Sequence, residues 1–245
     1  MPSREHAKAV VRRLHALSGG GEIVRKAAAR ELARLDPLDS NELLHHILQL
    51  AREGWEPATC VLSAFVAALG QESASIPYAD SMLRMAEVQS LDSVADLFRS
   101  APAHKEFDEG AAARADAKAF SQSLGHIKQQ ARITRDPDVL SRLATVSNPA
   151  VIRNALLNPR LTEDLVVRMA ARRPARPEPL VEIWKSTRWS SRHAVRRALV
   201  FNPYLPPEVG VKIVPLLNAQ DLAELAADYS VHASLREQAA RLLRG

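Results

Sequence analysis

Apolar residues recur along this chain with the spacing of an amphipathic helix. Val10, Val11 and Leu14 fall on one helical face, and the same spacing returns at Leu43 and Ile47. No segment alternates apolar and polar residues for long enough to form a strand. The pattern therefore predicts an all-α protein. In the first hundred residues it predicts helices over 4–17, 22–35, 40–53, 57–69, 77–88 and 90–99.

Turn residues separate these predicted helices. Gly19 to Gly21 ends the first helix and Asp36-Pro37 ends the second, while Asp39, three residues before Glu42, resembles a capping box that opens the third. The polar stretch over 101–112 shows little periodicity. We therefore expect an N-terminal helical region over 1–100, a loop or linker over 101–112 and a C-terminal repeat region over 113–245.

Proline marks helix starts in the second half of the chain. Ten of the 15 prolines lie at or after Pro137, yet helical spacing persists between them. An internal match places 155–161 beside 198–205 with a one-residue insertion, so Asn158-Pro159 and Asn202-Pro203 are 44 residues apart. A weaker third copy surrounds Asn148-Pro149. Asparagine can cap or turn the backbone at a helix junction, and proline fits the first turn that follows.

This succession of helix, Asn-Pro turn and helix resembles the bacterial HEAT-like and leucine-rich-repeat-variant α-solenoids over about 131–243. The resemblance implies an α-solenoid of short HEAT-like helical repeats that stack to bury their apolar faces, with the N-terminal helices either in the same array or in a separate section. In such an array Leu165 and Val209 would be equivalent buried positions. Members of these families are mostly protein-binding scaffolds, and one HEAT-like branch comprises DNA glycosylases.

Positive charge is concentrated in one segment of the chain. Between Arg168 and Arg197 nine Lys or Arg residues accompany two Glu, a local charge of +7 in a chain whose total is +5. The rest of the chain is therefore slightly acidic, and such asymmetry produces a directed field that attracts an acidic partner. The predicted binding patch comprises Arg168, Arg172, Arg173, Arg176, Trp184, Lys185, Arg188, Trp189, Arg192, Arg196 and Arg197.

The centre of this patch is expected on one helix. Arg188, Arg192 and Arg196 recur every four residues, which would align them along one helical face beside Trp184 or Trp189. Arginine with a neighbouring tryptophan can bind carboxylates, phosphates or an unstacked base. The same residues also fit a plain structural role, in which the arginines are solvated or paired with acidic neighbours and the tryptophans fill the core.

The sequence thus predicts a non-catalytic scaffold for an acidic protein partner, with no cofactor and no metal. Nucleic-acid binding is the alternative, followed by a glycosylase-type repair enzyme that would use Glu182 near Trp184 and Trp189. No run of apolar residues has the length of a membrane span. The chain start lacks a secretory signal and Cys60 is the one cysteine, so a cytoplasmic location is expected, while the oligomeric state stays open.

Overall fold

A computed structural model describes residues 2–17, 21–71, 75–99, 104–105, 123–144 and 146–244. Within these ranges the chain forms helices and turns and no strand, which confirms the all-α prediction. None of the helices in the described part of the chain combines the length and apolarity needed to cross a membrane.

The chain folds into two compact units. The first contains residues 1–101, 211–228 and 233–245, and the second contains 102–210 and 229–232. The last helices therefore group with the first hundred residues, which the local sequence pattern did not indicate. Of the predicted linker at 101–112, only residues 104–105 are described.

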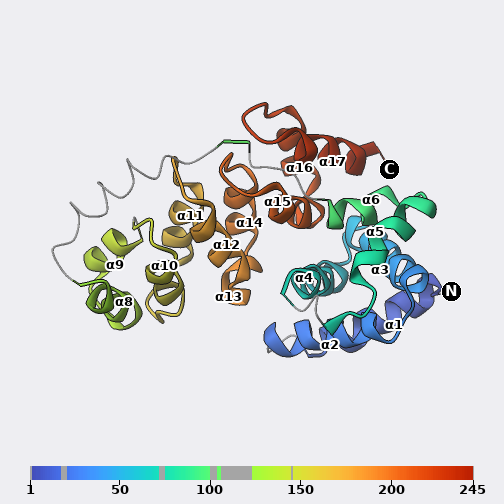
Figure 1. Cartoon of the computed structure of the whole chain (residues 1–245), viewed down its shortest axis with the longest axis horizontal. Helices are drawn as coiled ribbons and strands as arrows, with labels where there is room; N and C mark the ends of the chain where they lie inside the picture. The colour runs from blue at the N-terminus through green and yellow to red at the C-terminus, as the bar shows by residue number, and fades with distance from the viewer. Residues whose placement is uncertain are drawn as a thin grey trace. The chain divides into compact units, whose positions relative to one another are not determined.

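The first unit has its core on the long helix α3. The buried side chains of Leu43, Leu44 and Ile47 on α3 and Phe65 on α4 are not exposed at all, and α3 packs against α1, α4 and α5. Farther along the chain α16 packs against α17 (Figure 1). The helices of this unit are α1 (Arg4–His15), α2 (Gly21–Ala33), α3 (Pro37–Arg52), α4 (Glu56–Gln71), α5 (Ala79–Val88), α6 (Asp92–Ala95), the 3-10 turns η2 (Asp96–Phe98) and η3 (Val214–Leu216), α16 (Ala219–Ala227) and α17 (Ala233–Arg244).

The predicted start of α3 is wrong by one turn. Asp36 is the N-cap and Pro37 is the first helical residue, and the Asp36 carboxylate accepts a hydrogen bond from the Asp39 amide at 2.8 Å. Asp36-Pro37 therefore opens this helix instead of ending the one before it. The physical reason is that proline lacks the amide hydrogen that the first turn of a helix leaves unsatisfied.

The second unit is a succession of shorter helices. Helix α8 packs against α10, α10 against α12, and α11 against α14 (Figure 1). A buried cluster joins Ile127 and Ala131 of α8 to Val151 and Ala155 of α10. The helices are α8 (Leu124–Ile133), α9 (Pro137–Leu143), α10 (Pro149–Leu156), α11 (Glu163–Ala171), α12 (Pro177–Lys185), α13 (Thr187–Ser190), α14 (His193–Val200) and α15 (Pro207–Ile213), the last of which runs across the boundary between the units.

Asn158 and Asn202 have equivalent environments, as the internal match predicts. The Asn158 side-chain amide donates to the Ala131 and Thr134 carbonyls at the end of α8, at 2.9 and 3.0 Å. The Asn202 amide donates to the Ala170 and Arg172 carbonyls at the end of α11, at 2.7 and 2.9 Å. Each buried asparagine therefore satisfies carbonyls that a helix leaves open at its C-terminus.

The three Asn-Pro pairs do not share one role. Asn148 is the N-cap of α10 and its side chain accepts from the Ala150 amide at 2.9 Å. Asn158 and Asn202 instead lie just after α10 and α14. The side-chain oxygen of each accepts a hydrogen bond from the backbone amide of the residue that follows the proline. This local turn is the one that asparagine side chains favour.

The predicted burial of Leu165 is wrong. Val209 is buried as expected, at 8 % exposure, but Leu165 is half-buried. The apolar stripe of α11 follows the spacing of Val166, Met169 and Ala170, which leaves Leu165 at its edge.

Candidate binding site

The arginine row predicted along one helix face does not exist in the structure. Arg188 belongs to the four-residue helix α13, whereas Arg192 is the N-cap of α14 and has an extended backbone. Arg196 lies inside α14 and is only 8 % exposed. The helix breaks after Ser190, and Ser191 and Arg192 form the connection between α13 and α14, so the four-residue spacing no longer corresponds to one face.

Arg188 and Trp189 contact the backbone of their own chain. Arg188 donates to the Asn158 carbonyl at 3.2 Å, and its guanidinium lies 4.3 Å from the centre of the Trp189 ring. Trp189 is 4 % exposed and donates from its indole nitrogen to the Leu156 carbonyl at 3.1 Å. These two side chains therefore fix the turn that follows α10.

The other aromatic and carbonyl contacts of the patch are also internal. Trp184 on α12 is 7 % exposed. Arg173 donates to the Phe201 carbonyl at the end of α14, and the Arg197 guanidinium lies 4.8 Å from the centre of the Phe201 ring. Neither predicted tryptophan is thus available as a surface platform for a base.

Ion pairs reduce the charge of the remaining exposed cations. Arg168 pairs with Asp164 at 2.7 Å, one turn earlier on α11. Lys185 lies 3.8 Å from Glu182. Arg192 lies 3.9 Å from Glu163. The local charge of +7 is therefore not presented as one uniform surface.

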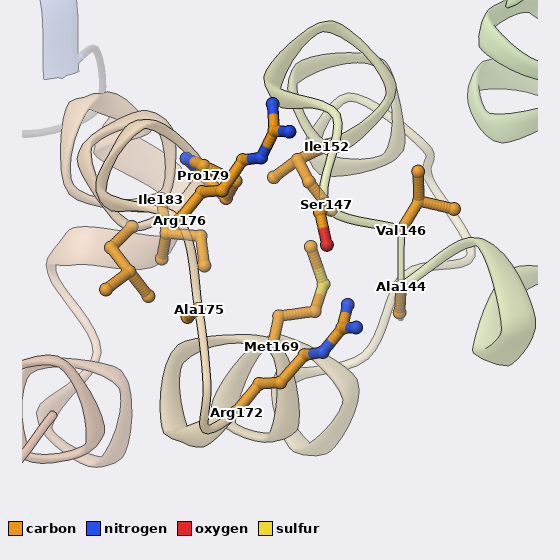
Figure 2. Close-up of a pocket in the computed structure, with 11 residues that line it drawn as sticks. Ala144, Val146, Ser147, Ile152, Met169, Arg172, Ala175, Arg176, Pro179 and Ile183 are labelled. Carbon is orange, nitrogen blue, oxygen red and sulfur yellow. The ribbon is translucent and has the colours of Figure 1, made fainter. Parts of the chain in front are cut away.

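Arg172 and Arg176 are brought together at a pocket. Arg172 is the C-cap of α11 and Arg176 is the N-cap of α12, so the short connection between two helices carries both. Their side chains flank a small opening of about 20 Å³, room for about one water molecule, whose walls come from α10, α11, α12 and the loop before α10. Figure 2 shows the Ser147 hydroxyl and the Met169 thioether between the two arginines.

The pocket combines an apolar interior with a cationic rim. Ile152, Met169 and Ile183 provide apolar surface, Ser147 provides the one hydroxyl, and none of the described lining residues is acidic. Arg172 is half-buried, and its guanidinium makes no hydrogen bond or ion pair within the described part of the chain. An opening of this size holds no side chain of a partner, so its binding chemistry is that of the rim, where guanidinium groups can bind a carboxylate or phosphate.

Both arginines belong to the predicted patch, but no pattern in the sequence predicts the pocket between them. Part of its wall comes from Ala144, Val146, Ser147 and Ile152, twenty or more residues before Arg172. The apolar residues carry the ordinary helical pattern of a core. No local signal shows that these segments leave a gap where they meet.

Glu182 does not have the environment of a general acid. Arg153 binds its carboxylate through two hydrogen bonds of 2.7 and 2.9 Å, and Lys185 lies nearby. The hydrogen bond from Arg153 is the main cause that lowers the pKa of Glu182, and its effect exceeds the opposing effect of burial. A general acid near neutral pH requires a raised carboxyl pKa, so Glu182 instead serves as an ion-pair partner in this structure.

No group of three or more His, Cys, Asp or Glu residues in the described ranges is arranged to hold a metal ion. Comparison of the chain with protein-family models, curated proteins and solved structures finds no match.

Proposed function

We propose that this protein is a non-catalytic scaffold, an α-solenoid of short HEAT-like repeats that binds an acidic protein segment. The observation that carries the proposal is the pocket between Arg172 and Arg176, where a cationic rim surrounds an apolar interior. A segment rich in Asp or Glu matches the charge of this rim.

Recurring structure in the second unit supports the repeat architecture. The equivalent hydrogen bonds of Asn158 and Asn202 connect α10 to α8 and α14 to α11, at positions 44 residues apart. Pro137 opens the helix that follows α8, and Pro177 opens the helix that follows α11. Helices that recur in the same order with the same connecting bonds are the units from which a solenoid is built.

Charge complementarity supports an acidic partner at this site. Arginine guanidinium groups bind carboxylates through paired hydrogen bonds, and Arg172 and Arg176 lie on one short connection. The opening of about 20 Å³ is too small to hold a partner's side chain, so the arginines of its rim make the contact. We therefore expect recognition of Glu or Asp carboxylates.

Nucleic-acid binding has less support from the geometry. Stacking of unpaired bases needs exposed aromatic rings, and Trp184 and Trp189 are 7 % and 4 % exposed. Phosphate contacts from arginine alone would give binding that weakens steeply with added salt. Steep salt dependence together with tight binding of a DNA duplex therefore distinguishes the nucleic-acid alternative from an acidic peptide.

Peptide display followed by anisotropy measurements tests the proposal. The purified full chain is used to select peptides from a random library, and selected peptides and a labelled DNA duplex are titrated at several salt concentrations. We expect the enriched peptides to be rich in Asp and Glu. Arg172→Glu with Arg176→Glu should weaken their binding at least about tenfold, roughly the loss of one charge-assisted contact.

The matched control is Arg168→Glu with Arg192→Glu. It changes the net charge equally but reverses two cations that lie outside the pocket lining and pair with Asp164 and Glu163. Arg172→Glu alone is measured too, because this guanidinium has no partner to lose within the described residues. Equal losses in both double variants, or a selection without acidic residues, would refute the pocket as the site. Tight duplex binding with a steep salt dependence would favour the nucleic-acid alternative.

A further inference from the structure

A second, polar pocket lies within the first unit and shares no lining residue with the proposed scaffold site. It has a volume of about 340 Å³ and is formed by α3, by the turn between α5 and α6, by the start of α6, and by α17. These segments are far apart in the sequence. The size is at the lower end of the range for small-molecule sites.

Three arginines line this pocket from two helices. Arg52 comes from α3, and Arg241 and Arg244 come from the last turn of α17. Asp92 is the single acidic residue of the lining. The pocket therefore has a net positive charge and favours an anion.

Two of the guanidinium groups are fixed in place by the protein. Arg241 lies 2.5 Å from the carboxylate of Asp96, which is only 2 % exposed, and Arg52 donates to the Leu242 carbonyl. Each contact uses part of the five N–H groups of an arginine, and both arginines still line the pocket. Cations also stabilise the C-terminus of a helix, but the bond from Arg52 to Leu242 already serves that purpose for α17. Anchored guanidinium groups bind an anion with less loss of side-chain entropy.

Ser90 in the pocket wall has a backbone conformation that favours glycine. Its φ is 56°, and it follows the end of α5, where the Leu91 amide donates back to the Ala86 carbonyl at 2.9 Å. Glycine is the usual residue at this position of a helix end, because it has no Cβ to oppose the left-handed conformation. Serine is less stable here, and residues in such conformations cluster at functional sites. Its hydroxyl at the pocket offers a reason for its presence.

The remaining polar lining is suited to phosphate oxygens. Ser90 and Ser93 provide hydroxyl donors, and Gln49 and His45 provide further polar atoms. Burial is the main cause that lowers the pKa of His45, with the neighbouring His46 as the next, so the imidazole is neutral at pH 7 and donates from one nitrogen. Three arginines and two hydroxyls exceed what a carboxylate with two oxygens can accept. They match a phosphate group with three terminal oxygens.

We propose that this pocket binds a small phosphate monoester, with Arg52, Arg241 and Arg244 on the phosphate oxygens and Ser90 and Ser93 as hydroxyl donors. The pocket exceeds the size of a phosphate ion, so the ester substituent occupies the rest of it beside His45 and Gln49. This inference does not depend on the scaffold function, since no residue of the first pocket takes part.

Calorimetric titration of the full chain tests this site. The probes are inorganic phosphate and glycerol 3-phosphate, with glycerol as the uncharged control. We expect saturable binding of glycerol 3-phosphate, weaker binding of inorganic phosphate and none of glycerol. A phosphate that binds as tightly as its ester would refute the role of the substituent, and the absence of saturable binding of either would refute the site.

Two variants test the assigned residues. Arg244→Ala should weaken ester binding about tenfold, as expected for the loss of a charge-assisted hydrogen bond. The control is Arg84→Ala, which removes the same charge from an exposed position of α5 outside the lining. Equal effects of the two would mean that only net charge matters and would overturn the site. Ser90→Gly should raise the thermal midpoint but weaken binding severalfold. A stabilised variant with unchanged affinity would overturn the role of Ser90.

Discussion

Replacement of Asn158 by alanine should destabilise the second unit by about 3 kcal/mol. The side chain is fully buried and makes three hydrogen bonds, two to the carbonyls of Ala131 and Thr134 and one from the Arg160 amide. Each bond contributes about 1 kcal/mol net, and a carbonyl left without a partner in a buried place costs more than that. Water can reach Thr134 and Arg160 and replace part of the lost hydrogen bonding, which limits the total loss in the free energy of unfolding.

Asn154→Ala is the matched control. Asn154 lies on α10, four residues earlier, and its side chain makes a single hydrogen bond of 2.8 Å to the Ala150 carbonyl within the same helix. Its loss should cost at most about 1 kcal/mol. Asn202→Ala should resemble Asn158→Ala, because its three hydrogen bonds are the same in kind.

Urea unfolding followed by tryptophan fluorescence measures these costs. In a Trp55→Phe background the signal comes from Trp184 and Trp189, which both belong to the second unit. The change in midpoint multiplied by the slope gives the loss in the free energy of unfolding. If Asn158→Ala cost no more than Asn154→Ala, the asparagine would not connect α10 to α8 in the way the hydrogen bonds indicate.

Three further predictions concern stability. Val166→Asp should lower the thermal midpoint severely, by the equivalent of about 3 kcal/mol or more, while Leu165→Asp at its half-buried position should cost far less; equal shifts would contradict the assigned stripe of α11. Trp189→Phe should cost about 1 kcal/mol in urea unfolding, since it removes the indole hydrogen bond but keeps a ring; a neutral result would count against that bond. The contact of Glu182 with Arg153 lowers the carboxyl pKa in the folded state, so the pair stabilises the protein above the unfolded pKa of about 4.3, and this contribution disappears as the pH falls through the lower folded value. Glu182→Gln should therefore destabilise the protein at pH 7 and have little effect near pH 2, and a difference that persists in acid would contradict the assignment.

Local sequence patterns predicted most helices of the first hundred residues. Helical periodicity correctly places α1, α4 and α5 to within about two residues, because the apolar stripe that a helix buries is formed by residues close together in the chain. The Asn158 and Asn202 match is also local in origin, since both turns use the same Asn-Pro pair. The start of α3 was missed because Asp36-Pro37 can end one helix or open the next, and only the hydrogen bond to Asp39 decides between them.

The binding surface could not be predicted in the same way. Charge spacing indicated a row of arginines, but the break between α13 and α14 places Arg188, Arg192 and Arg196 in separate environments. Whether an arginine faces solvent, an acidic neighbour or a carbonyl depends on residues some thirty positions away, such as Asn158 for Arg188. Sequence spacing contains no information on such partners.

The sequence by itself therefore determined the all-α class, the positions of α1, α4 and α5, the equivalence of two asparagine turns and the segment that carries excess positive charge. Only the tertiary structure decided which of those charges are paired or buried, that Arg172 and Arg176 meet an apolar pocket, and that the arginines of α3 and α17 line a second one. The physical reason is the distance along the chain between the residues that make each contact. Helices and turns are fixed by bonds between residues a few positions apart, whereas pockets and ion pairs form where distant segments meet.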